Sequence, residues 1–221
     1  MKERARRRSG AHAVSHRYDA PMPIDHHPFG ELLDAVAAKS PTPGGGAVTA
    51  AVGALGSALG SMVVNYTVGK KAYAAHEGEL QQALVTLANA RTLLLQLAGE
   101  DELAYGELNA LMRLPETDPR RADLPAVAAT ATQVPMAVIA TCTDLLRLFQ
   151  RLAGITNPML RSDLAIGAIL AEAAARASRL NAVINLPLLA TDADREAVEH
   201  ELSGLLAVAA DLARAVETAC A

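Results

Sequence analysis

The sequence is poor in aromatic residues and in cysteine, and it lacks the alternation of polar and apolar residues that marks β-strands. Of its 221 residues, 3% are aromatic and none is Trp. Its hydrophobic residues, 51% of the total, are mainly Ala and Leu, which favour helix. A chain of this length can bury a full core. We therefore expect an all-α fold, a multihelical array of long and short helices.

Two cysteines, Cys142 and Cys220, lie far apart and match no metal-binding or redox spacing. Free thiols fit a reducing cytosol, so we expect a cytoplasmic protein. The first residues hold no apolar segment after their arginines, which argues against a secretory signal. His26-His27 beside Asp25 could bind a metal ion, but adjacent residues point to different faces of a helix. We expect a solvated helix cap there and no metal site.

The charge is unevenly distributed along the chain. The net charge is −4, yet the first 20 residues carry six basic and two acidic side chains, a net +4, which leaves −8 for the remainder. An acidic body with few aromatic residues argues against a nucleic-acid-binding surface. We expect residues 1–24 to be a disordered basic tail and residues 25–221 to form a single helical domain.

The most distinctive stretch is Ser40-Pro41-Thr42-Pro43-Gly44-Gly45-Gly46-Ala47, followed by an uncharged run to Gly69. The prolines bias the chain toward extended backbone, and the glycines permit a sharp turn or close approach to a ligand. A helix that starts there would point free N–H groups at an anion. The simpler alternative is a tight turn into a closely packed, buried Ala/Gly-rich helix.

The uncharged run 44–69 is also long enough to cross a bilayer. It consists mainly of Ala, Gly, Ser and Thr, with too few Leu, Ile or Phe for membrane insertion, and we find no second span to pack beside it. A buried helix is the better interpretation, and a membrane-associated helical protein is the least favoured alternative.

Periodicity and terminal signals predict six helices. Gly99 and Gly106 are expected to bend or divide the third helix, and Pro135 to kink or break the fourth. Pro187 is expected to end whatever continues from the fifth helix. The predicted ranges are 28–39, 46–68 with Gly69 as its C-terminal signal, 77–114, 122–153, 162–181 and 192–218, the last capped by Thr191 or Asp192.

Several catalytic motifs are missing, including a P-loop, a zinc-protease helix and a nucleophile elbow. What remains is a scattered polar set, and each member has an ordinary structural explanation as a helix cap, a solvated turn or a buried amide. Its members are Lys70, Lys71, Tyr73, Glu100, Asp101, Tyr105, Asn157, Ser162, Asp163, Asn181 and Asn185.

The proline–glycine stretch, the helix after it and Gly69-Lys70-Lys71-Ala72-Tyr73 resemble the cyclodeaminase/cyclohydrolase family of folate enzymes. This family includes the cyclodeaminase part of formiminotransferase-cyclodeaminase and stand-alone methenyltetrahydrofolate cyclohydrolases. The resemblance covers about residues 26–219, and the extra tail, the short lysine run and Pro187 depart from it. The order of motifs continues through Asp101-x-x-x-Tyr105, Leu114-Pro115, Val134-Pro135, Asn157-x-x-x-x-Ser162-Asp163 and Asn181-x-x-x-Asn185-Leu186.

The resemblance implies an all-helical homodimer that dimerises through helices and acts on tetrahydrofolate one-carbon adducts, without a metal or a tightly bound cofactor. Tetrahydrofolate would be the one-carbon carrier, and a formiminotransferase a possible companion. A cyclodeaminase closes 5-formiminotetrahydrofolate to the 5,10-methenyl form and releases ammonia. A cyclohydrolase adds water to that form and yields 10-formyltetrahydrofolate. On family grounds we favour the deaminase slightly.

The resemblance also implies roles for individual residues. Asp163 is the first choice for the proton-transfer group, Asp101 the second, and Lys70 could donate a proton or hold a glutamate tail. The expected substrate-binding residues are Ser40, Pro43, Gly44, Gly45, Gly46, Lys71, Tyr73, Tyr105, Asn157, Ser162, Asn181 and Asn185. The alternative from another class is a non-catalytic folate-binding or helical assembly protein, which a large separation of Asp163 from Lys70 would favour.

Overall fold

The structure, a computed structural model, describes residues 28–221, and every regular element in that range is a helix. The expected all-α fold is confirmed, whereas the predicted tail at residues 1–24 lies outside the described residues. The elements, with η for a short 3₁₀ helix, are α1 (Phe29–Ala37), α2 (Gly45–Asn65), η2 (Lys71–His76), α3 (Glu77–Met112), η3 (Pro119–Asp123), α4 (Leu124–Leu152), η4 (Pro158–Leu160), α5 (Arg161–Val183), η5 (Leu186–Leu188) and α6 (Asp192–Cys220).

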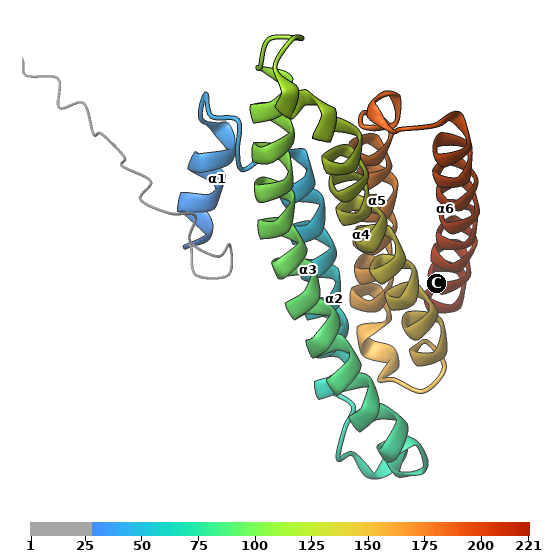
Figure 1. The fold of residues 1–221 in the computed structure, drawn as a ribbon. Helices are drawn as coiled ribbons and strands as arrows, with labels where there is room; N and C mark the ends of the chain where they lie inside the picture. The colour runs from blue at the N-terminus through green and yellow to red at the C-terminus, as the bar shows by residue number, and fades with distance from the viewer. Residues whose placement is uncertain (1–27) are drawn as a thin grey trace, which may run out of the picture.

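Helices α2 to α5 run alternately up and down as a bundle (Figure 1). Helix α2 packs against α3 and α5, and α4 packs against the same two helices from the other side. Helix α6 covers α4 and α5, while α1 lies beside the bundle near the start of α2 and has no buried residue. The upper end of the bundle in Figure 1 therefore holds the start of α2 and the end of α5.

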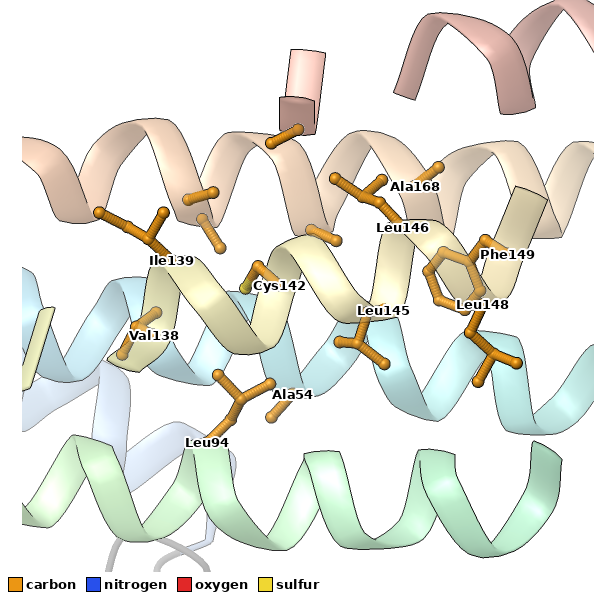
Figure 2. Packing of buried hydrophobic residues seen from close by; sticks show 14 of the residues in the cluster. Ala54, Leu94, Val138, Ile139, Cys142, Leu145, Leu146, Leu148, Phe149 and Ala168 are labelled. Carbon is orange, nitrogen blue, oxygen red and sulfur yellow. The ribbon is translucent and has the colours of Figure 1, made fainter. Parts of the chain in front are cut away.

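The core lies between these helices and is centred on α4. Its side chains meet Ala54 of α2, Leu94 of α3 and Ala168 of α5 in one buried cluster (Figure 2). Phe149 of α4 is the largest fully buried side chain of the described residues, and burying such a ring contributes about 1.5–3 kcal/mol. Small residues on α2 and α5 leave room for these larger ones.

Helix α2 is buried because glycines on one side let its neighbours approach closely. A Cβ at Gly53 would lie 2.9 Å from Cys142 Sγ, and one at Gly56 would lie 2.9 Å from the Gly167 carbonyl oxygen. A Cβ at Gly60 would overlap the ring of Phe149. The predicted buried Ala/Gly-rich helix is therefore confirmed as the part of the bundle against which α3, α4 and α5 pack.

Neither α3 nor α4 is divided at the positions where a bend or a break was expected. Helix α3 continues through Gly99 and Gly106, where a Cβ would meet nothing within 4 Å, so these glycines mark open surface and not a break. Helix α4 continues through Pro135, which is buried in it, because packing on both sides outweighs the missing hydrogen bond.

Most predicted helix ends are confirmed. Gly69 has a φ of 75°, the left-handed conformation expected of a glycine that follows a helix. Thr191 forms a capping box with Asp194 at the start of α6. Pro187 lies in η5, so the chain turns between α5 and α6 as predicted.

Two helical segments of the described residues are long and apolar enough to cross a membrane, Gly45–Asn65 and Pro119–Leu152. The second corrects the sequence-based expectation that no other span would accompany the first. In the apolar 18-residue window of each segment, 50% of the first and 44% of the second is buried inside the protein, so about half of each window packs within the bundle.

We predict that Gly60→Ala lowers the free energy of unfolding by about 1–3 kcal/mol, because the added methyl group overlaps the Phe149 ring in a filled core. Gly99→Ala is the matched control, a helical glycine with open space around it, and should stabilise the protein by about 0.5–1 kcal/mol. Urea unfolding followed by circular dichroism measures both. Equal effects of the two substitutions would contradict the packing account.

Candidate active site

A cavity of about 230 Å³ lies at the upper end of the bundle, where α2 begins and α5 ends. It collects residues from the segment before α2, from the second half of α3, from α4 and from the end of α5. The lining residues are Pro41, Thr42, Gly44, Gly45, Gly46, Asp101, Ala104, Tyr105, Leu108, Ala131, Asn181, Ile184 and Asn185.

The glycines of the 44–46 segment serve close packing and not an unusual backbone. Gly44 is the N-cap of α2 with an extended backbone, φ −116°, and the one glycine with positive φ among the described residues is Gly69. A Cβ at Gly46 would overlap the carboxyl group of Asp101, and one at Gly45 would lie 3.3 Å from Asn181 Oδ1. The close approach that these glycines were expected to allow a ligand is therefore made by two side chains of the protein, those of Asp101 and Asn181.

The preceding turn is built by Ser40 and two prolines. The Ser40 hydroxyl donates to the Thr42 carbonyl oxygen at 2.8 Å, and the Thr42–Pro43 peptide bond is cis. Pro41 and Thr42 form one wall of the cavity. Ser40 and Pro43 belong to this turn without lining the cavity themselves.

Asp101 lies against the first turn of α2. Burial raises the pKa of its carboxyl group, and the backbone N–H of Ala47, which donates a hydrogen bond to it, opposes that shift. The anion that the start of this helix was expected to hold is therefore the chain's own carboxylate. A carboxyl group with a raised pKa beside a cavity is suited to accept and return a proton.

Asn181 and Asn185 stand one helical turn apart at the end of α5 and both line the cavity. Asn185 is 9% exposed, and neither side-chain amide forms a hydrogen bond with another residue of the range 28–221. Asn181 is half-buried, and the polar atoms of neither amide are sealed inside the protein, so both amides present donors and acceptors to whatever occupies the cavity.

The other predicted site residues lie toward the opposite end of the bundle. Lys70 precedes η2, and Asp163 is in the first turn of α5. A hydrogen bond of 3.0 Å from Asn157 N to Thr67 Oγ1 joins the two segments that carry them. Asp163 and Asn181 are 18 residues apart on one continuous helix, which is about 27 Å.

This second group consists of Lys70, Lys71, Tyr73, Asn157, Ser162 and Asp163. Its members have local structural roles where the contacts are known: the Asn157 side chain, for example, accepts from Met159 N and starts η4. The hydrogen bond between the Thr67 and Asn157 segments places Lys70 and Asp163 at the same end, so the separation that would favour a non-catalytic protein is not observed. One chain therefore carries two groups of candidate residues, one at each end of the bundle.

Comparisons with known proteins agree with this fold. The family model described as Formiminotransferase-cyclodeaminase matches residues 28–204. The chain belongs to this family. A methenyltetrahydrofolate cyclohydrolase of Methylorubrum extorquens is 36% identical over 82% of this chain and 89% of its own length. The formimidoyltransferase-cyclodeaminase of Rattus norvegicus is 31% identical over 82% of this chain, which spans 36% of that longer protein.

The crystal structure of a formiminotetrahydrofolate cyclodeaminase from Thermotoga maritima has the same fold, with a TM-score of 0.84 and 31% identity. The match covers 89% of this chain and 97% of the other. The family match and the all-helical architecture therefore agree.

The sequence did not reveal the apolar wall of this cyclodeaminase-family cavity. Ala104, Leu108, Ala131 and Ile184 are chemically ordinary, and no periodicity distinguishes them from core residues. The sequence did contain one signal for Ala131. Pro135 has no N–H, so the Ala131 carbonyl four residues earlier lacks its usual helical partner and is free to face the cavity. No group of three metal-ligating side chains occurs in residues 28–221, and the His26-His27 pair lies outside the described residues.

We predict that Gly46→Ala displaces the Asp101 carboxyl group and lowers the free energy of unfolding by about 1–3 kcal/mol, because the new methyl group overlaps that group. Gly44→Ala is the matched control: its Cβ would make an ordinary 3.6 Å contact with the Pro41 carbonyl oxygen. Urea unfolding and a crystal structure of each variant test this. An Asp101 carboxyl group that stays in place in Gly46→Ala would show that the two residues do not compete for the same space.

Proposed function

We propose that this protein is an enzyme that closes or opens the 5,10-methenyl bridge of tetrahydrofolate. The first candidate is a formiminotetrahydrofolate cyclodeaminase, a lyase, which the fold match over 97% of the Thermotoga maritima enzyme supports. The second is a methenyltetrahydrofolate cyclohydrolase, a hydrolase, which the 36% identity to the Methylorubrum extorquens enzyme supports. The observation that carries both is Asp101, a carboxyl group of raised pKa at a cavity lined by two amides.

Asp101 can supply the proton transfer that either reaction needs. In the deaminase, the formimino group reacts in its protonated form: N10 bonds to its carbon, and the bond from that carbon to the departing nitrogen breaks. The carboxylate accepts the proton that N10 loses and, as the acid, returns it to the departing ammonia. In the cyclohydrolase, the same group moves a proton from the attacking water to N5 as the ring opens. Its negative form also stabilises the cationic carbon centre.

The cavity suits a ring system better than a whole folate. Its volume of about 230 Å³ is below the roughly 300–1,000 Å³ of typical ligand pockets. We propose that the pterin packs on Leu108 and Ala131, hydrogen-bonds Asn181 and Asn185, and is oriented by Tyr105. No Lys, Arg or His is among the described residues that line the cavity, so the glutamate carboxylates need cations from elsewhere.

We propose that those cations come from a second copy in a homodimer. Helices α2 and α5 each expose one apolar row at helical spacing, and the two rows together form what we call the α2–α5 face. Ile184 belongs both to this face and to the cavity wall. The exposed members of the face are Val48 and Leu55 on α2, Tyr66 directly after it, Ile166, Ile169 and Leu180 on α5, and Ile184 directly after it.

An antiparallel second copy on the α2–α5 face would set its own Lys70, Lys71, Tyr73, Asn157, Ser162 and Asp163 beside this cavity. The two groups of candidate residues, about 27 Å apart along α5 in one chain, would then meet across the interface. We further propose a cytoplasmic protein that binds no membrane and works beside a formiminotransferase. The two free cysteines and the name of the Rattus norvegicus relative support this.

We predict that the purified protein raises the methenyltetrahydrofolate absorbance from 5-formiminotetrahydrofolate, or removes it faster than spontaneous hydrolysis. Asp101→Asn should lower the rate by about 100-fold or more, because Asn cannot transfer a proton. Glu107→Gln, on the exposed surface of the same helix, is the control and should keep the full rate. A wild-type protein without either activity would refute the proposed function and leave the non-catalytic folate-binding alternative.

We predict that Asp163→Asn is impaired alone and that mixing it with Asp101→Asn restores activity. Random exchange of subunits produces hybrid dimers with one intact composite site, which gives about a quarter of the wild-type activity. The measurement is turnover after the mixed variants have been unfolded and refolded together. Full activity of Asp163→Asn alone would remove that residue from the mechanism, and no recovery on mixing would contradict a site shared between subunits.

A further inference from the structure

A buried chain of hydroxyl groups leads from α5 to the start of α2. The Ser178 hydroxyl donates to Thr49 Oγ1 at 2.9 Å, and the Thr49 hydroxyl donates to the Gly46 carbonyl oxygen at 2.8 Å. Ser178 is 0% exposed and Thr49 is 8% exposed. These two residues are 129 positions apart in the sequence, so their contact depends on the packing of α5 against α2.

The chain of hydrogen bonds ends at Asp101. The Gly46 carbonyl and the Ala47 N–H belong to one peptide group. The Asp101 carboxyl group lies against Gly46, in the space that a Cβ there would need, and hydrogen bonding from the Ala47 N–H lowers the pKa of this carboxyl group. Donors to the carbonyl oxygen polarise the peptide and strengthen its N–H as a donor. The series therefore runs from Ser178 through Thr49 and the Gly46–Ala47 peptide to the carboxylate.

Other buried threonines do not share this arrangement. Thr143 on α4 is 0% exposed, and its hydroxyl donates at 2.8 Å to the Ile139 carbonyl of its own helix. That bond is the usual one for threonine within a helix. The buried Thr67 hydroxyl also accepts from another segment, from Asn157 N at 3.0 Å, but it donates to Val63 of its own helix end. Thr49 differs because its hydroxyl accepts from α5 and donates to the peptide that lies against Asp101.

We propose that Thr49 and Ser178 are positioning residues for Asp101 and act through the Gly46–Ala47 peptide. The proposal rests on the proposed function for the role of Asp101 in proton transfer. The hydroxyls hold the peptide in place and strengthen the hydrogen bond to the carboxylate form. They thereby set how readily Asp101 takes up and releases a proton.

Few other ionisable groups of the described residues lie near Asp101, so the effect of the Thr49 and Ser178 hydroxyls on its pKa can be measured. Among the described residues that line the cavity, Tyr105 is the other titratable one. On α3 itself, Glu100 is exposed and Glu102 is half-buried. The segments of α2, α4 and α5 that line the cavity contribute Gly, Ala, Asn and Ile. Substitutions at Thr49 and Ser178 change no charge, so they leave these groups as they are.

The test is the titration of Asp101 by NMR of protein labelled with ¹³C at its aspartate carboxyl groups, assigned with Asp101→Asn. Thr49→Val removes the donor to the Gly46 carbonyl and keeps the side-chain shape. Because the carboxylate is then stabilised less, the pKa of Asp101 should rise by about 0.1–0.7 pH unit. Ser178→Ala should shift it in the same direction by less, and Thr49→Ser should restore the wild-type value.

Thr143→Val is the matched control, since it removes a buried threonine hydroxyl far from the cavity and should leave the Asp101 titration unchanged. In turnover measurements, the limb of the pH profile that reports Asp101 should move to higher pH in Thr49→Val by the same amount. If Thr49→Val does not fold, Ser178→Ala carries the test. A titration of Asp101 unchanged in the folded variants would overturn the proposal. A wild-type protein inactive on folates would overturn the proposed function but not the titration result.

Discussion

The close approach of three helices to α2 is the constraint on which the rest of the structure depends. Gly53, Gly56 and Gly60 leave room for Cys142, for the backbone of α5 and for the Phe149 ring. Because the interior is filled to the density of a crystal, none of these positions can gain a methyl group without moving a neighbour. The same packing that buries α2 brings α3 and α5 to its first turn, where the cavity forms.

Close packing extends to the first turn of α2, which forms part of the candidate active site. Gly46 has room for no side chain because the Asp101 carboxyl group occupies that space. Burial there raises the pKa of Asp101, while the Ala47 N–H limits the rise. A helix start that could have bound an external anion is thus satisfied by an internal one, whose proton affinity is set by packing.

The two groups of candidate residues lie at opposite ends of the bundle. A single chain places Asp101, Asn181 and Asn185 at the cavity and Asp163 at the far end of α5. Neither group by itself combines proton transfer, ring binding and cations. The apolar α2–α5 face borders the cavity at Ile184, and on our proposal a second copy on this face brings the two groups together.

The helical class and most helix ends could be predicted from the sequence, because composition, spacing and capping residues act locally. Gly69 and Thr191 are examples, and so is the family, which its ordered motifs carry. Gly99, Gly106 and Pro135 did not interrupt their helices, since packing around a helix outweighs one local preference. Which polar residues meet depends on how the helices pack, and no local signal contains that information. Asp101 lies against Gly46 and shares the cavity with Asn181. Asp163 lies in the first turn of α5, and this helix of 23 residues holds it far from Asn181 near the other end.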